Sequence, residues 1–186
     1  MNTCDRCQGN EATIILTNDE QERLCGSCFN EMMSEEVGVE LKTIPAAISL
    51  YDFNGSRRNF ILQQRLYPNG IFLEASEDRD YGYQFAVHGE LDCDQTELLE
   101  KLREKVKSGV SKQFIKAGQF PNGQAYISII NDEFVGLVDH DENSQAAPMI
   151  VIDGQPYTWE EVGEMVKSFE GFQVQMKFFD MTDDID

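Results

Sequence analysis

The feature that most constrains this chain is a pair of Cys-x-x-Cys motifs close to its N-terminus. Cys4 and Cys7 form the first motif, and Cys25 and Cys28 form the second. Each motif can grip one metal ion from a tight turn, and two motifs together complete a tetrahedral tetrathiolate site. Such a shell leaves no coordination position open for substrate. We therefore predict one structural Zn²⁺ ion, with Cys4, Cys7, Cys25 and Cys28 as its ligands.

The sequence between the two motifs predicts a β-hairpin. Residues 12–16 are typical of a strand, residues 17–20 of a turn, and Arg23-Leu24 of a short return strand. After Cys28, residues 29–36 favour a helix that ends at Gly38. A metal-binding turn, a hairpin, a second turn and a helix are typical of a zinc-ribbon or treble-clef fold. We predict such a module over residues 1–38.

Two other uses of paired cysteines fit the sequence less well. A thioredoxin-like redox couple needs one Cys-x-x-Cys motif, whereas this chain has two that bracket a hairpin. Disulfides need an oxidising compartment, and residues 1–4 show no basic region or apolar core of a signal peptide. We expect reduced cysteines and a cytoplasmic location. The fifth cysteine, Cys93, has no partner in the pattern and is expected to be half-buried.

The N-terminal motifs resemble those of a known family. Cys4-x-x-Cys7, the strand start Ala12-Thr13 and Leu24-Cys25-x-x-Cys28 are similar to the N-terminal zinc module of McsA-type bacterial adaptors. Those adaptors activate and steer a protein-arginine kinase. The resemblance covers about a fifth of the chain, which has neither a second four-cysteine module nor an evident coiled helical tail. It implies the metal role of the four cysteines and does not extend to kinase activation.

The formal net charge of −19 is the strongest global feature of the 186-residue chain. It is unevenly spread: residues 1–45 carry a net −6, residues 46–118 a net −1, and residues 119–186 a net −12. A molecule with this field repels nucleic-acid phosphates and anionic membranes. No apolar run approaches the roughly 20 residues of a membrane span. The acidity either serves solubility alone or attracts a protein partner with a basic surface.

Beyond a tether at residues 39–45, the pattern predicts an antiparallel-sheet domain with two helices over residues 46–180, and an acidic tail at 181–186. Alternating apolar side chains predict strands, and a period near 3.6 predicts a helix capped by Asp94 and a second helix at 159–168. The expected strands cover 47–53, 59–67, 71–75, 83–87, 125–130, 134–138, 148–152 and 172–178. The predicted fold class is therefore α+β.

The two halves of this domain, residues 46–118 and 119–180, share turn motifs. Tyr67-Pro68-Asn69-Gly70 and Phe120-Pro121-Asn122-Gly123 each open an alternating strand. The halves are thus candidates for a duplicated β-β-β-α unit, although Pro-Asn-Gly is ordinary turn chemistry.

No catalytic constellation is evident. His88 and His140 lack a nucleophile motif, and phosphate-binding glycine motifs are absent. Residues 139–150 start like a calcium loop, but Ser144 replaces the turn glycine and Ile150 the final glutamate. Arg57-Arg58 is expected at a solvated hairpin end.

These observations favour a non-enzymatic zinc-binding adaptor or regulatory protein that acts through protein–protein contacts. The first alternative is an acidic inhibitor that mimics nucleic acid in the basic groove of another protein. The second is an enzyme without a recognisable motif, which would be favoured by a pocket that holds a histidine beside a perturbed carboxylate. The sequence leaves the partner and the oligomeric state open.

Overall fold

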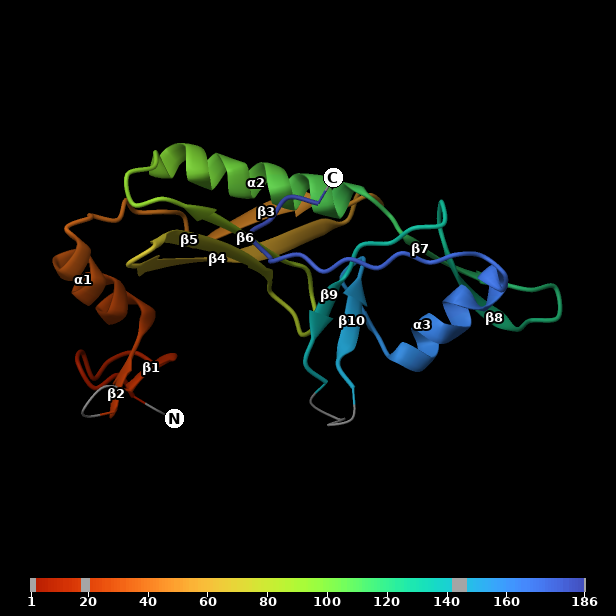
Figure 1. The fold of residues 1–186 in the computed structure, drawn as a ribbon, viewed down its shortest axis with the longest axis horizontal. Coiled ribbons are helices and arrows are strands. Elements are labelled where there is room, and N and C mark those ends of the chain that lie inside the picture. Colours follow the sequence, from red (N-terminus) through yellow and green to blue (C-terminus); the bar gives the residue numbers. More distant parts are fainter. Residues whose placement is uncertain (1–2, 18–20, 142–146, 186) are drawn as a thin grey trace.

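The protein is an α+β molecule built from antiparallel sheets and three α-helices, here in a computed structural model (Figure 1). The structure describes residues 3–17, 21–141 and 147–185. A four-stranded sheet forms the centre, with one long helix along one face (Figure 1). The N-terminal hairpin and first helix lie at one end of the molecule, and the β7–β8 hairpin extends from the other end. No helix among the described residues is long and apolar enough to cross a membrane.

The N-terminal segment follows the expected order. Strands β1 (Ile14–Thr17) and β2 (Gln21–Leu24) pair antiparallel, and helix α1 (Gly26–Val37) follows directly. Gly38 ends the helix in the left-handed conformation, and its N–H donates to the carbonyl of Ser34. The predicted turn at 17–20 falls largely on residues 18–20, which lie outside the described residues.

The central sheet has the strand order β3-β4-β5-β6 and is antiparallel throughout. Its strands are β3 (Ala47–Tyr51), β4 (Arg57–Tyr67), β5 (Gly70–Glu77) and β6 (Gln84–Gly89). The register places Leu62 opposite Ala75, and Leu73 opposite Val87. Because side chains alternate across a strand, these apolar residues share one face of the sheet.

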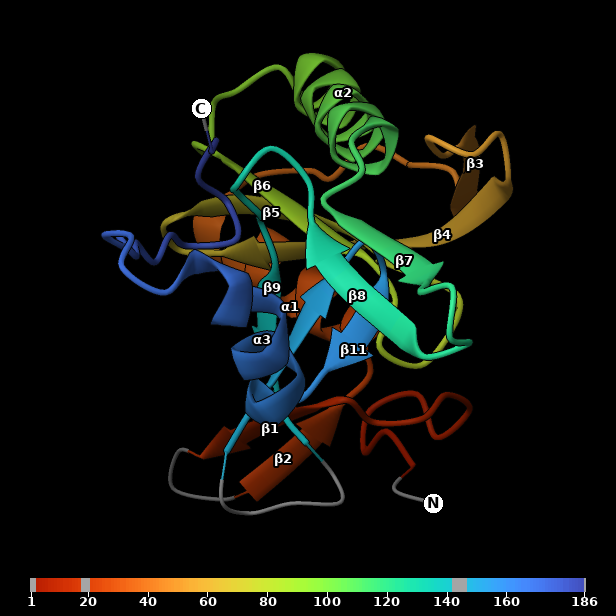
Figure 2. The same ribbon diagram turned by 90° about the vertical axis from the view of Figure 1, so that its right-hand side faces the viewer.

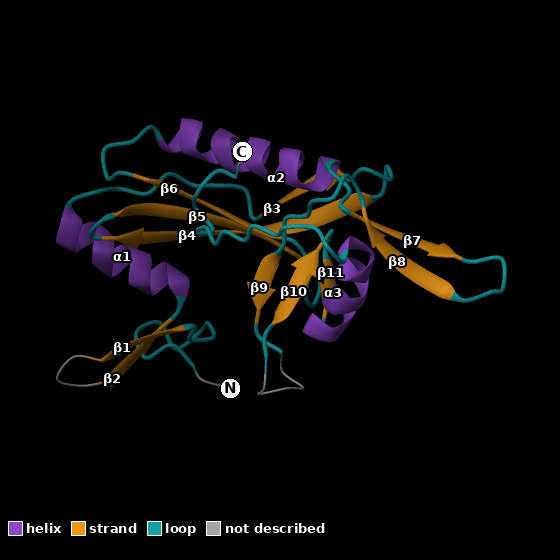
Figure 3. Ribbon diagram, turned by 45° about the vertical axis from the view of Figure 1, so that its right-hand side comes forward, coloured by secondary structure: helices purple, strands orange, loops and turns teal. Residues whose placement is uncertain are grey.

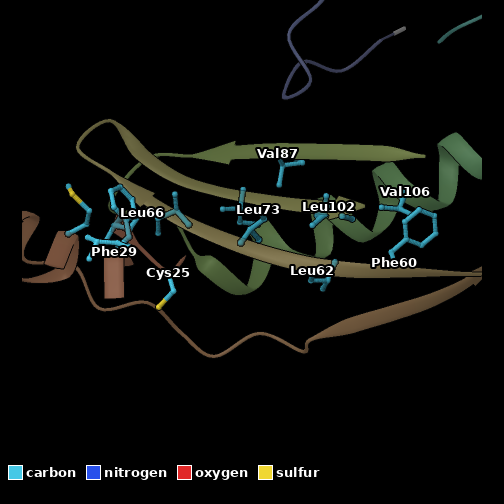
Figure 4. Packing of buried hydrophobic residues seen from close by; sticks show 14 of the residues in the cluster. Cys25, Phe29, Phe60, Leu62, Leu66, Leu73, Val87, Leu102 and Val106 are labelled. Carbon is cyan, nitrogen blue, oxygen red and sulfur yellow. The ribbon is translucent and has the colours of Figure 1, made fainter. Parts of the chain in front are cut away.

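Helix α2 (Gln95–Ser111) covers that face. Its buried residues are Leu98, Leu102, Val106 and Val110, which recur at helical spacing. Asp94 caps the helix as predicted, and its carboxylate accepts the Thr96 N–H at 2.7 Å. Figure 4 shows Leu102 and Val106 pointing into the same cluster as Phe60, Leu62 and Leu73.

Gly109 lies inside helix α2, although glycine commonly ends or interrupts a helix. A Cβ at this position would lie 2.3 Å from Cε1 of Phe85. The glycine therefore allows the close approach of helix α2 to strand β6, and packing overrides the low helix propensity of glycine.

The expectation of a solvated Arg57-Arg58 pair is wrong for Arg58. Its guanidinium bonds the Asp52 carboxylate at 2.8 Å and the Glu77 carboxylate at 2.9 Å. Asp52 is buried, and it also accepts the backbone N–H groups of Asn54 and Ser56. The β3–β4 turn is therefore closed by a buried ion-pair network.

The C-terminal half has a different topology. Strands β7 (Ile115–Gln119) and β8 (Ala125–Ile129) form a separate hairpin. Strands β9 (Leu137–Asp139), β10 (Met149–Ile152) and β11 (Gln155–Tyr157) form a second sheet in the order β11-β10-β9. Helix α3 (Trp159–Val166) follows, with the predicted capping box of Thr158 and Glu161, and continues into a 3-10 turn, Lys167–Phe169. Figure 2 shows β7–β8, the three-stranded sheet and α3 on the side of the central sheet away from α2.

A repeated strand-strand-strand-helix order is therefore not found. The first half forms one four-stranded sheet, and the described part of the second half forms a hairpin and a three-stranded sheet. Strands β7 and β11 had no counterpart among the predicted strands. Both are short, and β11 contains Pro156, so neither presents a long alternating pattern.

The predicted strand at 172–178 is not a strand in the structure. Residues 172–178 lie outside every sheet, and the Val174 side chain is 89% exposed. The chain then returns towards α2 (Figure 3), where Lys105 Nζ donates to the carbonyl oxygen of Met181 at 2.8 Å. The acidic tail contacts α2, where Lys101 and Lys105 both pair with Asp184.

Candidate metal centre

The four cysteines of the two motifs converge on one point. The Sγ atoms of Cys4, Cys7, Cys25 and Cys28 all lie within 4.8 Å of one another. Cys4, Cys25 and Cys28 are buried, and Cys7 is exposed. Four soft donors at this separation can hold one metal ion. The sequence alone was sufficient to identify this set.

The first pair is held by a tight turn. The Gln8 N–H donates to the Cys4 carbonyl at 3.0 Å, and the Cys4 N–H donates to the Asn10 carbonyl at 2.9 Å. Gln8 adopts a positive φ of 55°, which turns the chain back around the cysteines. The hairpin β1–β2 then brings the chain back, and the Asp5 carboxylate binds Arg23 at 3.0 Å across it.

The second pair lies at the N-terminus of helix α1. Cys25 is the N-cap residue, Cys28 lies in the first turn, and the Phe29 N–H donates to the Cys25 carbonyl at 3.0 Å. Free N–H groups and the positive end of the helix dipole favour negative charge at this place. The N-terminus of helix α1 therefore favours the thiolate form of the N-cap residue Cys25.

The pKa values of the thiols follow from these surroundings. The backbone N–H of Cys7, more than any other group, lowers the pKa of Cys4 to about 6. The backbone N–H of Cys28 lowers the pKa of Cys25. Burial among the other thiols raises the pKa of Cys28 to about 12. Four thiolates this close to one another repel without a cation, so a bound cation would favour full deprotonation of the cluster.

Two arginines and an asparagine lie next to the cluster. Arg6 Nη1 donates to the Cys28 carbonyl at 3.3 Å, and Asn10 Nδ2 lies 3.8 Å from Cys25 Sγ. A Cβ on Gly26 would lie 2.7 Å from Nη1 of Arg65, so the glycine admits this guanidinium to the N-terminus of helix α1. Positive charge here offsets part of the negative charge of a tetrathiolate.

Helix α1 joins the cluster to the central sheet. Asn30 Nδ2 donates to the Gln64 carbonyl at 2.9 Å, and its Oδ1 accepts the Leu66 N–H at 3.0 Å. The side-chain amide thus pairs with strand β4 as a neighbouring peptide group would. Phe29 is buried beside Leu66 (Figure 4), and its ring lies 5.5 Å from that of Tyr67. Asn30 gave no signal in the sequence, because its partners are 34 and 36 residues away.

The tether at 39–45 also has defined contacts. The Lys42 N–H donates to Gln95 Oε1 at 2.7 Å, and Gln95 Nε2 donates to the Glu40 carbonyl at 2.9 Å. Val39, Leu41 and Ile44 pack against the central core. The module and the sheet are therefore joined by packing as well as by the chain.

The two histidines lie apart from the cysteine cluster and from each other. His88 ends strand β6, where its Nε2 lies 3.0 Å from the Asn69 carbonyl oxygen and its ring packs on Phe72. His140 is exposed beyond β9. Cys93 is half-buried, as expected, and burial raises the pKa of its thiol.

A cavity of about 340 Å³ lies between β6, α2, the second sheet and the C-terminal tail. Tyr83, Lys105 and Asp153 are among its lining residues, and neither histidine is. Burial raises the pKa of Asp153, whose carboxylate accepts the N–H groups of Phe114 and Ile115 at 2.8–3.2 Å. This carboxylate therefore joins the β10–β11 turn to the start of strand β7. A histidine–carboxylate pair is not among the residues that line this cavity.

Comparison with protein families divides the chain into three parts. Residues 3–40 match a family model described as Domain of unknown function (DUF7685), residues 42–111 match Domain of unknown function (DUF7686), and residues 114–183 match Domain of unknown function (DUF7713). No curated protein and no solved structure matches the chain. None of the three descriptions names the McsA-type adaptors, so that resemblance stays a hypothesis. The two halves of the main domain match different families.

Proposed function

We propose that the cysteine cluster holds one structural Zn²⁺ ion and that the surrounding segment is a treble-clef or zinc-ribbon module. Zn–S bonds of about 2.3 Å in a tetrahedron place sulfur atoms about 3.8 Å apart. The separation of Cys7 Sγ and Cys25 Sγ is 3.8 Å. Four thiolates leave no ligand position for substrate, so the ion would hold the fold and take no part in chemistry.

The protein would act as a non-enzymatic adaptor or regulator through protein–protein contacts. One observation carries this proposal: three of the four clustered cysteines, Cys4, Cys25 and Cys28, are buried in the same core as the central sheet. A metal in this position would fix the hairpin β1–β2 and helix α1 relative to the sheet. Such a site would provide a rigid surface for contact with another protein. The nucleic-acid mimic and the enzyme stay alternative hypotheses.

The acidic C-terminal half suggests a partner with a basic surface. Residues 119–186 carry fourteen acidic and two basic side chains. Asp132 and Glu133 are exposed in the β8–β9 connection, and Glu160 is exposed on helix α3. A basic surface that approaches this side would be steered and held electrostatically. The contact would take place in the cytoplasm, where reducing conditions keep thiols free. Asp141 is buried and does not belong to this surface, and Glu142 lies outside the described residues.

The test measures zinc content first and partner capture second. Purified protein should contain close to one zinc per chain, and Cys4→Ser should lose it. Capture from bacterial lysate should then weaken for the triple variant Asp132→Asn, Glu133→Gln, Glu160→Gln, and more so at low salt. A matched control neutralises Glu97, Glu100 and Glu104 on helix α2. Capture that is equal for both variants and unchanged at high salt would contradict the electrostatic contact.

A further inference from the structure

Residues 171–179 have the alternating sequence of a β-strand but belong to no sheet in the structure. Phe172, Val174, Met176 and Phe178 alternate with Gln173, Gln175 and Lys177, as in a strand with one apolar face. The four apolar side chains are exposed by 72%, 89%, 58% and 74% in that order. Single exposed apolar residues are ordinary, but four on one face of an extended segment mark a contact surface.

The backbone of this segment is also unpaired. Between residues 173 and 179, no N–H or carbonyl group bonds to another described residue, while the turns on either side are closed by the Phe172 N–H and the Asp183 N–H. A segment can pair as a strand with another chain when its peptide groups are free and its apolar side chains alternate. Both conditions hold here.

The segment carries little charge in a strongly acidic chain. Residues 171–179 contain one lysine and no acidic residue, whereas the chain has 34 acidic residues and a formal net charge of −19. Two copies that approach through an acidic surface bring carboxylates together and repel each other. Contact through this segment avoids that repulsion along nine residues.

The order of side chains is self-complementary. An antiparallel pair centred on Gln175 places Phe172 opposite Phe178 and Val174 opposite Met176, each from the other copy. Gln173 then lies opposite Lys177 on the second face. This is the isologous arrangement that a two-fold axis requires.

We propose that residues 171–179 form the dimerisation strand, and that their occupant is the same segment of a second copy of this chain. The two strands pair through their free peptide groups, and the facing side chains, Phe172 with Phe178 and Val174 with Met176, contact one another on one face of the ribbon. At the ends of the ribbon, Glu170 lies opposite Asp180 of the other copy, so salt strengthens the dimer by screening this pair and the net charge of each chain.

The experiment uses the full zinc-loaded chain. Sedimentation equilibrium should give a mass that rises with protein concentration from 21.2 kDa towards twice that value. Raising the salt from about 0.05 M to about 0.5 M should increase the dimer fraction. Hydrogen exchange at alternate amides between residues 173 and 179 should slow by about tenfold as the mass doubles, because every second N–H of each strand bonds to the partner strand.

Two variants test the strand itself. Val174→Asp places a charge in the apolar face, and Gln175→Pro removes a strand donor without adding charge. Both side chains are exposed, so the folded monomer should keep its unfolding midpoint while the dimer is lost. Ile15→Asp is the matched control, because Ile15 is 56% exposed on β1 and lies outside the segment.

Three results would overturn the proposal. The first is a monomer at all accessible concentrations and salts, which would leave the segment to a different protein. The second is a dimer that survives both variants, which would place the interface elsewhere. The third is exchange protection at 173–179 that does not depend on concentration, which would mean that the segment pairs with an open sheet edge of its own chain.

Discussion

Single residues with two structural roles are the most informative in this molecule. Asn30 lies on helix α1 yet completes hydrogen bonds at strand β4, and Arg58 lies on a strand yet closes the turn beside it. In both cases a polar side chain is bound to groups that would otherwise be buried without a partner. The removal of such a side chain costs more than the hydrogen bonds it makes, because its partners stay desolvated.

Asn30→Ala should therefore destabilise the protein by about 1–3 kcal/mol, since it leaves the Gln64 carbonyl and the Leu66 N–H unpaired at a partly buried site. Urea unfolding followed by circular dichroism measures the change. Glu31→Ala, at an exposed position on the same helix, should change the stability by less than about 0.5 kcal/mol. Equal effects of the two substitutions would mean that Asn30 does not join the module to the sheet.

Arg58→Ala should cost about 3–5 kcal/mol, because it leaves Asp52 and Glu77 as buried charges without a cation. Burial opposes ionisation of Asp52, but the Arg58 guanidinium and the Ser56 and Asn54 N–H groups outweigh it and hold the pKa of Asp52 below its usual value. The pKa of Asp52 is lower in the folded than in the unfolded state. Its contribution to stability is therefore present above about pH 4 and is lost as the pH falls through the folded value. In Asp52→Asn the unfolding free energy should depend less on pH below about pH 4 than in the parent protein.

At the scale of elements, close approach between helix and sheet decides which residues are tolerated. Helix α2 and strand β6 meet at Gly109, where only hydrogen fits against the Phe85 ring. Helix α3 presents the opposite case, because a Cβ at Gly163 would meet no atom within 4 Å. The two helices thus provide a matched pair of glycine positions.

Gly109→Ala should destabilise the protein by about 1–3 kcal/mol through overpacking against Phe85, despite the gain in helix propensity. Gly163→Ala should stabilise it by about 0.5–1 kcal/mol, because helix propensity acts there without a clash. Thermal unfolding of both variants under the same conditions gives the comparison. A stabilising Gly109→Ala would show that α2 and β6 are not in close contact at this point.

At the scale of the whole molecule, the apolar core divides into two clusters. The larger joins Cys4, Cys25 and Cys28, helix α1, the central sheet and helix α2. The smaller lies in the C-terminal half and includes Ile115, Ile152 and Met165, with Trp159 packed against it. The cysteine cluster and the central sheet therefore share one core, while the C-terminal half has a core of its own.

Removal of the metal by a chelator, or by Cys25→Ser, should consequently destabilise the central sheet as well as residues 3–37. Hydrogen exchange should speed up in β4 and β5, and remain unchanged in β10 and α3. Fluorescence of Trp159, the single tryptophan, reports on the smaller cluster and should change little at that stage. Exchange that changes only in residues 3–37 would instead mean that the module is an independent unit.

The sequence by itself determined the four clustered cysteines, the hairpin between them, the cap of helix α2 and the α+β class. Each depends on residues that are close in the chain, where spacing and period set the local geometry. Asn30, the buried Arg58, the place of Gly109 within a helix and the docked tail were decided by tertiary structure, because their partners are distant in the chain or come from other elements. Residues 172–178 show most clearly what the sequence cannot predict. An alternating pattern indicates which face of a strand would be apolar. A strand also needs a neighbour with free peptide groups, and only the fold decides whether such a neighbour is in reach.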